Sequence, residues 1–233
     1  MQGIDKRMKV MILAAGRGER MRPLTDHTPK PLLPVAGKAI IEHTIVQLAS
    51  AGFTEIIINH AHLGQQIEDY LGDGRRYGVS ICYSPEGEKG LETAGGIINA
   101  LPLLGSEVFL VVNGDIATDF PFAKLKNITV DLAHLILVNN PEHHLQGDFV
   151  LDMAGRVVEN GTEKLTFSGI GLYRPELFCN TPPGNSKLGA LLCQAMVNQR
   201  VSGQKFTGFW MDIGTPERLQ ELNNLLKSRI NYD

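Results

Sequence analysis

The stretch that decides the fold is Lys9-Val-Met-Ile-Leu-Ala-Ala-Gly-Arg-Gly18, close to the start of the chain. It is a continuous apolar run of strand length that ends in a glycine-rich turn. An apolar run without alternation predicts a strand buried on both faces, which is typical of a parallel sheet. The turn that follows would present backbone N–H groups at the carboxyl edge of that sheet, where α/β proteins bind their ligands.

Outward from this strand, predicted helices and strands alternate with short joints through the first half of the chain. The apolar pattern predicts helices at 40–51, 65–71 and 93–104 and strands at 55–59, 79–83 and 108–112. This alternation predicts a Rossmann-like, doubly wound α/β fold.

Beyond residue 115 the alternation of helices and strands stops, and successive strands follow one another without helices between them. Strands are predicted at 132–138, 148–153, 156–159 and 165–173, and helices at 187–199 and 215–226. We therefore expect a mixed sheet with extra antiparallel strands in the second half. Residues 8–233 form a single domain in this interpretation, and the polar, unpatterned residues 1–7 form a disordered or extended start.

Composition and charge exclude several classes of protein. The chain has 233 residues, 43% of them hydrophobic, and a formal charge of -3, so it has no general affinity for a nucleic acid polymer. Its three cysteines are too scattered for a disulfide framework and suit a reducing compartment. The apolar run at 10–15 is far too short to span a membrane. We expect a cytoplasmic protein with no membrane partner. The sequence leaves its oligomeric state open and is compatible with a monomer.

The segment after the first strand has the chemistry of a phosphate site. It carries four cations, Arg17, Arg20, Arg22 and Lys30. Prolines on both sides of Lys30 stiffen the loop, and we expect them to hold Lys30 in an extended segment with its ammonium directed at a phosphate. Cations beside exposed amides predict a triphosphate or pyrophosphate site, and a solvated basic loop is the alternative.

Two other phosphate motifs are excluded by single residues. The dinucleotide fingerprint requires a third glycine where this chain has Met21, and an acidic residue where the next strand ends at Asn59. The Walker A motif requires Ser or Thr where Gly37-Lys38 is followed by Ala39.

The pattern GxGxR from Gly16, followed by PLT and PKPLLPV, resembles the signature of the sugar-1-phosphate nucleotidyltransferases. Asn113-Gly-Asp115 resembles the metal-binding element of that family, and Trp210-Met-Asp-Ile-Gly-Thr-Pro216 resembles its late motif. The similarity runs from Met8 to about Leu226. It implies the nucleotide-diphospho-sugar transferase type of α/β fold, a nucleoside triphosphate and a sugar 1-phosphate as substrates, and Mg²⁺ as cofactor.

The resemblance also implies roles for individual residues. The nucleotide would be bound by Ala15, Gly16, Gly18, Glu19, Arg20, Lys30, Glu86, Gly95 and Asn113. The catalytic residues would be Arg20, Lys30 and Asp115, and Mg²⁺ would be held by Asp115 and Asp212. The sugar would be contacted by Asn113, Asp148, Glu159 and Ser168.

Physical reasoning supports these roles unequally. A divalent cation held by one or two carboxylates suits a reaction that joins two phosphates. Taken alone, Asp115 and Asp212 are more often turn or cap residues, and only the resemblance favours them as ligands. Glu86 is either a solvated charge or a group that reads a base edge. The histidines at 60, 62, 143 and 144 are expected to be solvated or hydrogen-bonded rather than metal-bound.

Within the family, four segments most resemble the enzymes that use UTP and N-acetylmuramate 1-phosphate in bacterial cell-wall recycling. They are Asn59-His-Ala-His-Leu63, Leu91-Glu-Thr-Ala-Gly-Gly-Ile97, Gly147-Asp-Phe149 and Thr166-Phe-Ser-Gly169. The alternatives are a guanylyl- or uridylyltransferase for another sugar 1-phosphate, or a non-catalytic nucleotide-sugar sensor. We expect a sensor to have lost Lys30 or one of the two aspartates, and this chain keeps all three.

Overall fold

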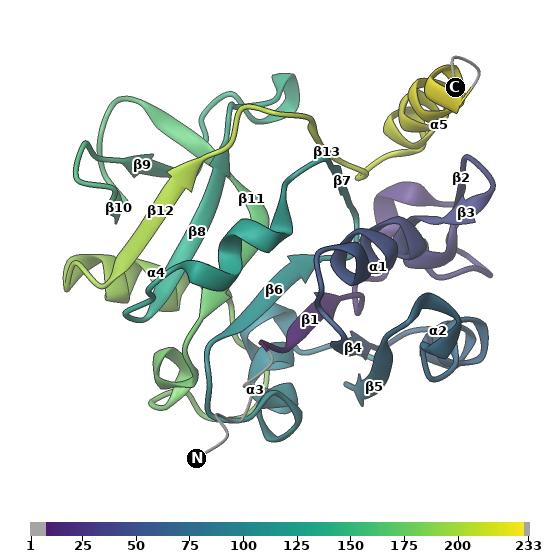
Figure 1. Cartoon of the computed structure of the whole chain (residues 1–233), viewed down its shortest axis with the longest axis horizontal. Coiled ribbons are helices and arrows are strands. Elements are labelled where there is room, and N and C mark those ends of the chain that lie inside the picture. The colour runs from purple at the N-terminus through teal and green to yellow at the C-terminus, as the bar shows by residue number, and fades with distance from the viewer. Residues whose placement is uncertain (1–7, 231–233) are drawn as a thin grey trace.

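A nine-stranded mixed sheet with helices on both faces organises the chain (Figure 1). The structure is a computed structural model that describes residues 8–230. The prediction made for residues 1–7 lies outside the described residues. The predicted fold class is confirmed, because parallel and antiparallel strands share one sheet between two layers of helices.

The first half of the chain forms the parallel part of the sheet, in the order β5, β4, β1, β6. These strands are β1 (Val10–Leu13), β4 (Glu55–His60), β5 (Ser80–Pro85) and β6 (Phe109–Asn113). The connecting helices are α1 (Ile40–Ser50), α2 (Gly64–Leu71) and α3 (Glu92–Leu104). Strand β1 lies between β4 and β6, so the order in which strands are added to the sheet reverses beside the first strand. Such a switch point opens a crevice at the carboxyl edge of the sheet.

The second half extends the sheet with antiparallel strands (Figure 1). It comprises β8 (Ala133–Val138), β9 (Phe149–Leu151), β10 (Val157–Val158), β11 (Lys164–Tyr173), α4 (Leu188–Val197) and β12 (Val201–Lys205). Strand β11 is central, since it pairs with β6, β8 and β9. Strand β12 was not predicted, because its Ser, Gly, Gln and Lys residues have low β propensity, and its parallel pairing with β8 makes it a strand.

The core lies on both faces of the sheet, and alternate residues of one strand belong to different sides. Val10 and Ile12 pack in the cluster that contains α1 and α2, whereas Met11 packs in the cluster that contains α3 and α4. All three side chains are fully buried. The burial of both faces explains why the strand is a continuous apolar run.

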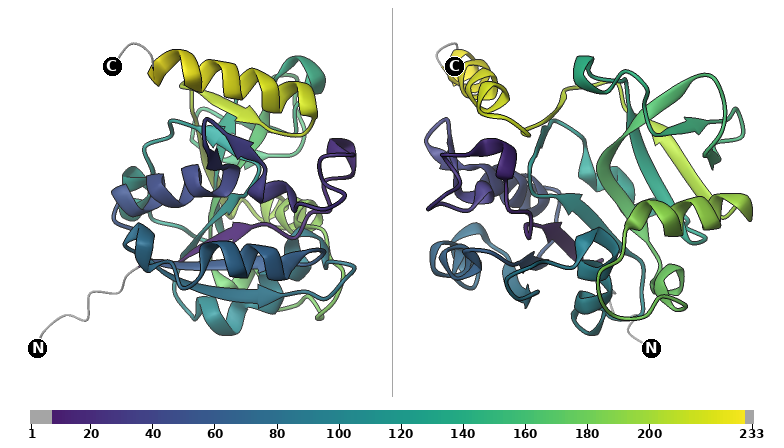
Figure 2. Two further views of the ribbon diagram at one scale, coloured as in Figure 1. Left: turned by 90° about the vertical axis from the view of Figure 1, so that its right-hand side faces the viewer. Right: turned by 180° about the vertical axis from the view of Figure 1, so that it is seen from behind.

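A third, smaller cluster joins the C-terminal helix to the loop after β1 (Figure 2). Helix α5 (Pro216–Ile230) packs on the hairpin of β2 (Pro34–Val35) and β3 (Lys38–Ala39). The predicted start of this helix, with Thr215 as cap and proline at the first position, is confirmed, since Arg218 N lies 3.4 Å from Thr215 Oγ1.

A separate two-stranded ribbon links the two halves of the chain. Strand β7 (Ile116–Thr118) pairs antiparallel with β13 (Trp210–Asp212), and Asp212 lies opposite Ile116. Ile213 N then donates to the carbonyl of Asp115 at 2.7 Å. This ribbon brings together two segments nearly a hundred residues apart in sequence.

Candidate active site

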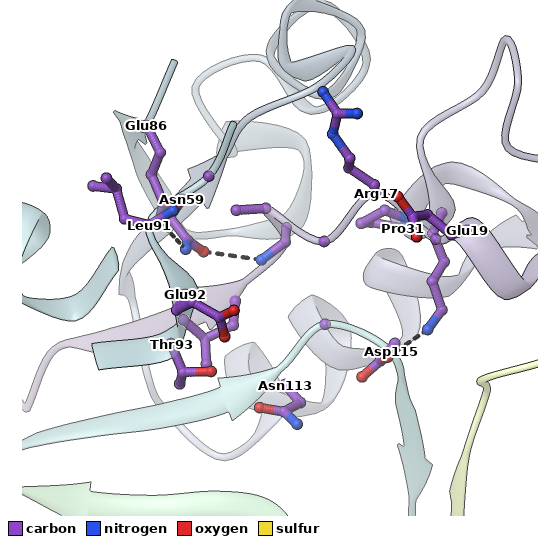
Figure 3. Close-up of a pocket in the computed structure, with 18 of the residues that line it drawn as sticks. Arg17, Glu19, Pro31, Asn59, Glu86, Leu91, Glu92, Thr93, Asn113 and Asp115 are labelled. Atoms are coloured by element: carbon purple, nitrogen blue, oxygen red, sulfur yellow. Dashed lines mark hydrogen bonds and ion pairs between the residues drawn. The ribbon is translucent and has the colours of Figure 1, made fainter. Parts of the chain in front are cut away.

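A cavity of about 680 Å³ opens at the carboxyl ends of β1, β4 and β6 (Figure 3). Its lining includes most of the residues predicted on the nucleotide side, namely Ala15, Gly16, Gly18, Glu19, Arg20, Lys30, Glu86, Asn113 and Asp115. The position agrees with the crevice expected at the switch point of the sheet.

The glycine-rich turn forms one wall of this cavity. The backbone N–H groups of residues 15–18 donate no hydrogen bond within residues 8–230, so they are available to an anion. Gly18 has φ of +64°, and a Cβ there would lie 2.9 Å from Cγ2 of Thr25. The Thr25 hydroxyl donates to the Gly18 carbonyl at 2.8 Å and holds the turn in place. The position requires glycine for both conformation and space.

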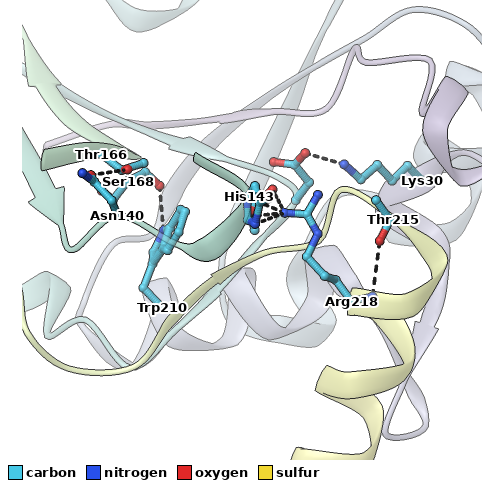
Figure 4. Close-up of polar contacts among 10 residues, drawn as sticks. Lys30, Asn140, His143, Thr166, Ser168, Trp210, Thr215 and Arg218 are labelled. Atoms are coloured by element: carbon cyan, nitrogen blue, oxygen red, sulfur yellow. Dashed lines mark hydrogen bonds and ion pairs between the residues drawn. The ribbon is translucent and has the colours of Figure 1, made fainter. Parts of the chain in front are cut away.

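Lys30 enters the cavity from the proline-rich loop. The prediction that it lies in an extended segment is wrong, because Lys30–Leu32 form a turn of 3-10 helix with Pro31 as its second residue. Proline fixes φ at about −65°, and this value is compatible with a helix as well as with an extended chain. The flanking prolines therefore did not distinguish the two conformations. The Lys30 side chain is only 10% exposed, and its ammonium forms an ion pair with Asp115 (Figure 4).

Asp115 lies just beyond the end of β6, where β1 and β6 are closely packed. The N–H of Gly114 donates to the carbonyl of Leu13 at 2.8 Å, and a Cβ on Gly114 would lie 2.6 Å from that oxygen. A larger residue would separate the two strands at this point. Glycine therefore lets the chain turn immediately after β6 and places the Asp115 carboxylate, 37% exposed, at the cavity.

The second predicted metal ligand is held by basic neighbours. Asp212 does not itself line the cavity, although Gly214 does. Both carboxylate oxygens of Asp212 accept from Nη1 of Arg218, at 2.6 and 2.7 Å. His143 Nε2 lies 2.9 Å from the same carboxylate (Figure 4). Each of the two aspartates is thus paired with a cation of the protein.

The donor set of Asp115 and Asp212 fits a hard divalent cation. Within the described part of the chain, no three His, Cys, Asp or Glu side chains are grouped closely enough to form a metal site by themselves. Magnesium commonly takes only one or two carboxylates and completes its coordination with substrate phosphates and water. The backbone contact between Ile213 and Asp115 keeps the two segments adjacent.

Of the four histidines considered from the sequence, His60, His143 and His144 lie within hydrogen-bonding distance of carboxylates, and His62 is exposed. His60 Nε2 lies 2.7 Å from Glu68, and His144 Nε2 lies 3.0 Å from Asp148. His143 contacts Asp212, so this histidine belongs to the surroundings of the site even though its spacing in sequence gave no such indication.

Glu86 is part of an internal network that shapes the other wall of the cavity. Asn59 accepts from the Ala14 amide at 2.9 Å and donates to Glu86 Oε1 at 2.5 Å. Glu86 Oε2 accepts from the Leu91 amide at 2.7 Å. Burial raises the pKa of the Glu86 carboxyl, and these hydrogen bonds oppose the rise. Of the two predicted interpretations, the solvated charge is wrong, because the carboxylate ties the loop after β5 to the end of β4.

Two predicted sugar contacts are occupied by bonds inside the protein. The Ser168 side chain is buried, and its hydroxyl donates to the Ile136 carbonyl at 2.7 Å. Asp148 accepts from the Phe167 amide at 2.8 Å, and its other oxygen contacts His144. Neither residue lines the cavity. Asn113 is the predicted sugar residue that does.

Gly95 and Glu159 also lie outside the lining of the cavity. The Gly95 amide donates to the Ser186 carbonyl at 3.1 Å, and a Cβ there would lie 2.1 Å from the Gly184 carbonyl, so this glycine allows α3 to pack on a loop. Glu159 is exposed and hydrogen-bonds the Cys193 thiol, whose pKa is raised by burial and then by this carboxylate.

Some residues of the site were not singled out from the sequence. Asn59 and Asn185 line the cavity, and Arg218 contacts Asp212. Asn59 ends a parallel strand, which is a usable signal. Asn185 and Arg218 carry no such signal, since each depends on which segments the fold brings to the cavity.

Comparisons with known proteins agree with this geometry. A model of the family described as nucleotidyl transferase matches residues 9–229. The chain is 58% identical over 226 residues to an N-acetylmuramate alpha-1-phosphate uridylyltransferase from Neisseria meningitidis serogroup B, covering 94% of this chain and 98% of that protein. It is 33% identical to the protein of the same description from Caulobacter vibrioides, and this match covers 89% of this chain and 92% of that protein.

Among solved structures, the chain is similar to a protein from Bacillus anthracis assigned as a glucose-1-phosphate thymidylyltransferase, in complex with a sucrose. The TM-score is 0.80 at 25% identity, and the match covers 94% of each chain. Separately, none of the helices within residues 8–230 combines the length and the apolar composition that a membrane span requires.

Proposed function

The chain belongs to the nucleotidyl transferase family, and we propose that it transfers the uridylyl group of UTP to N-acetylmuramate 1-phosphate, giving UDP-N-acetylmuramate and pyrophosphate. The observation that carries the proposal is the 58% identity to an N-acetylmuramate alpha-1-phosphate uridylyltransferase, extending over 94% of this chain and 98% of that protein. Such an enzyme would serve the recycling of cell-wall peptidoglycan in the cytoplasm. The three free thiols of the structure suit that reducing compartment.

The reaction requires two anions to approach one another. An oxygen of the sugar phosphate attacks the α-phosphorus of UTP and forms a new P–O bond, while the bond from that phosphorus to the bridging oxygen breaks and pyrophosphate leaves. The nucleophile is already an anion, so the protein needs no base and no covalent intermediate. Positioning and neutralisation of charge provide the catalysis.

The nucleotide wall of the cavity suits the triphosphate. The free amides of residues 15–18 would bind phosphate oxygens, and Arg20, which is exposed at the cavity, would neutralise the departing pyrophosphate. Lys30 would contact both phosphates, because its ammonium already lies at the carboxylate beside which they meet. The uracil would lie against the loop at 86–93, which lines the cavity on its far side.

Magnesium is the cofactor of this proposal, with Asp115 and Asp212 as its protein ligands. When bound, the cation would neutralise charge on the phosphates that react. The pairing of Asp115 with Lys30 would then be replaced, which would free the Lys30 ammonium for the substrates.

A pyrophosphate-release assay with each of the four common ribonucleoside triphosphates and several sugar 1-phosphates tests the proposal. We expect UTP to exceed GTP by at least ~100-fold in kcat/KM, because polar groups that face the wrong base remain buried and unpaired. We also expect N-acetylmuramate 1-phosphate to exceed N-acetylglucosamine 1-phosphate. A preference for GTP with mannose or heptose 1-phosphate would overturn the substrate assignment, and absence of any release with every pair would favour a nucleotide-sugar sensor.

A further inference from the structure

Arg218 lies in the first turn of α5, directly behind the wall of the cavity. Its side chain is only 15% exposed, and its hydrogen bonds within residues 8–230 all involve one nitrogen, Nη1. That nitrogen donates to both oxygens of Asp212 and lies 2.6 Å from Nε2 of His143. The guanidinium is therefore fixed in position by a carboxylate on one side.

The other edge of this guanidinium is free. Within the part of the chain that the structure describes, Nε and Nη2 of Arg218 donate no hydrogen bond. Nη2 packs against Gly214, where an added Cβ would lie 2.2 Å from it. Gly214 lines the cavity, so the free edge lies next to a residue of the cavity wall. A pair of N–H groups on one edge of a guanidinium matches the two oxygens of a carboxylate.

The charges of the two substrates indicate which anion this edge serves. In the proposed reaction the phosphates would face the free amides of the turn, Arg20, Lys30 and Mg²⁺. The carboxylate of the lactyl ether is the one further anionic group of N-acetylmuramate 1-phosphate. Arg218 does not itself line the cavity, but it comes from α5 to lie against Gly214, which does. In Figure 4 it lies beside His143, separately from the loop that carries Lys30.

We propose that Arg218 binds the lactyl carboxylate of the sugar substrate through Nε and Nη2 and thereby determines the specificity for a muramate sugar. This inference rests on the proposed function. Gly214 contributes by its small size, because any side chain at this position would occupy the place of the guanidinium. The Asp212 carboxylate contributes by orienting the guanidinium through Nη1.

The competing explanation is that Arg218 only positions Asp212. The two explanations differ in their dependence on the sugar. N-acetylglucosamine 1-phosphate lacks the lactyl group but has the same phosphate, so a residue that merely positions Asp212 affects both sugars equally. A residue that binds the carboxylate affects the muramate sugar more.

The test measures kcat/KM for both sugar phosphates, at subsaturating concentration with UTP and Mg²⁺, in the wild type, Arg218→Gln and Arg218→Lys. We expect Arg218→Gln to lose at least about tenfold more activity with the muramate sugar than with the glucosamine sugar, the size of one charge-assisted contact. Arg218→Lys keeps the positive charge but lacks the paired N–H groups of the guanidinium, so its loss of preference for the muramate sugar should be intermediate. Arg200→Gln is the control. Arg200 directly precedes β12, at the other edge of the sheet, and pairs with Asp131, so its loss should leave kcat/KM for both sugars unchanged.

A second measurement requires no turnover. Calorimetric titration with UDP-N-acetylmuramate and UDP-N-acetylglucosamine should show tighter binding of the former to the wild type, and Arg218→Gln should remove most of that difference. Thermal melting of each variant identifies loss of folding. Equal losses with both sugars, in both Arg218 variants, overturn the inference and leave the proposed function intact. A wild type that uses UTP without preferring the muramate sugar overturns both.

Discussion

The two halves of the molecule differ in how their polar side chains are used. On the side proposed for the nucleotide, the turn after β1 and the loop around Lys30 present amides and cations to the cavity with few internal partners. In the antiparallel half, Ser168 and Asp148 are engaged in hydrogen bonds that hold β8, β9 and β11 together. The turn after β1 thus leaves polar groups free at a strand end of the parallel half, whereas Ser168 and Asp148 of the antiparallel half are used to hold strands together.

The largest effect that this comparison predicts is at Asp115, the proposed metal ligand of the parallel half. Asp115→Asn should lower kcat/KM at least ~100-fold, because it removes a charged oxygen from the place where, in the proposed function, the two phosphates meet. Steady-state assays of pyrophosphate release measure the loss, with circular dichroism to verify folding. Asp131→Asn is the control, since Asp131 is exposed, pairs with Arg200 and does not line the cavity. Activity unchanged in Asp115→Asn would remove this residue from the site.

Lys30→Met should have the next largest effect. We expect kcat to fall about 10- to 100-fold, the size of one lost charge-assisted hydrogen bond, with a smaller change in the KM for UTP. The reason is that the ammonium matters most when the two phosphates are brought together. Separate determination of kcat and KM decides the question. A raised KM with unchanged kcat would indicate uniform binding of the ground state and the transition state instead.

Gly18→Ala should affect both stability and UTP binding. The positive φ alone should cost about 1–2 kcal/mol, and the added methyl group would also displace Thr25 and disturb the free amides. We expect the KM for UTP to rise about tenfold, consistent with one disturbed phosphate contact. Gly37→Ala is the matched control, with φ of +82° and nothing within 4 Å of the added Cβ. It should lose comparable stability and keep the KM of the wild type.

The smallest catalytic effect should come from Ser168→Ala. We expect kcat/KM to stay within about twofold of the wild type, while the free energy of unfolding falls by about 1–2 kcal/mol because the buried Ile136 carbonyl loses its donor. Urea denaturation and the pyrophosphate assay together measure this separation. A loss of activity that exceeds the loss of stability would show that Ser168 serves the sugar after all, and that the contrast between the two halves is weaker than described.

The fold of the first half was predictable because its signals are local. A run such as Val10–Leu13 is apolar on both faces only if both faces are buried, and the glycine turn that follows must lie at a carboxyl edge. The second half was less predictable. Strand β12 could not be predicted from its own residues, because its β propensity is low and its pairing with β8 makes it a strand.

The sequence by itself determined the class of fold and the loop proposed to bind phosphates, with its glycine turn at one end and Lys30 at the other. These properties depend on neighbours within a few positions of the chain. Only the tertiary structure decided which polar groups face the cavity. The pairing of β7 with β13 places Asp212 beside the segment of Asp115 and carries Arg218 to the cavity border, while the packing of β11 turns Ser168 inward. Contacts between residues distant in the chain depend on strand register and helix packing, which no local pattern specifies.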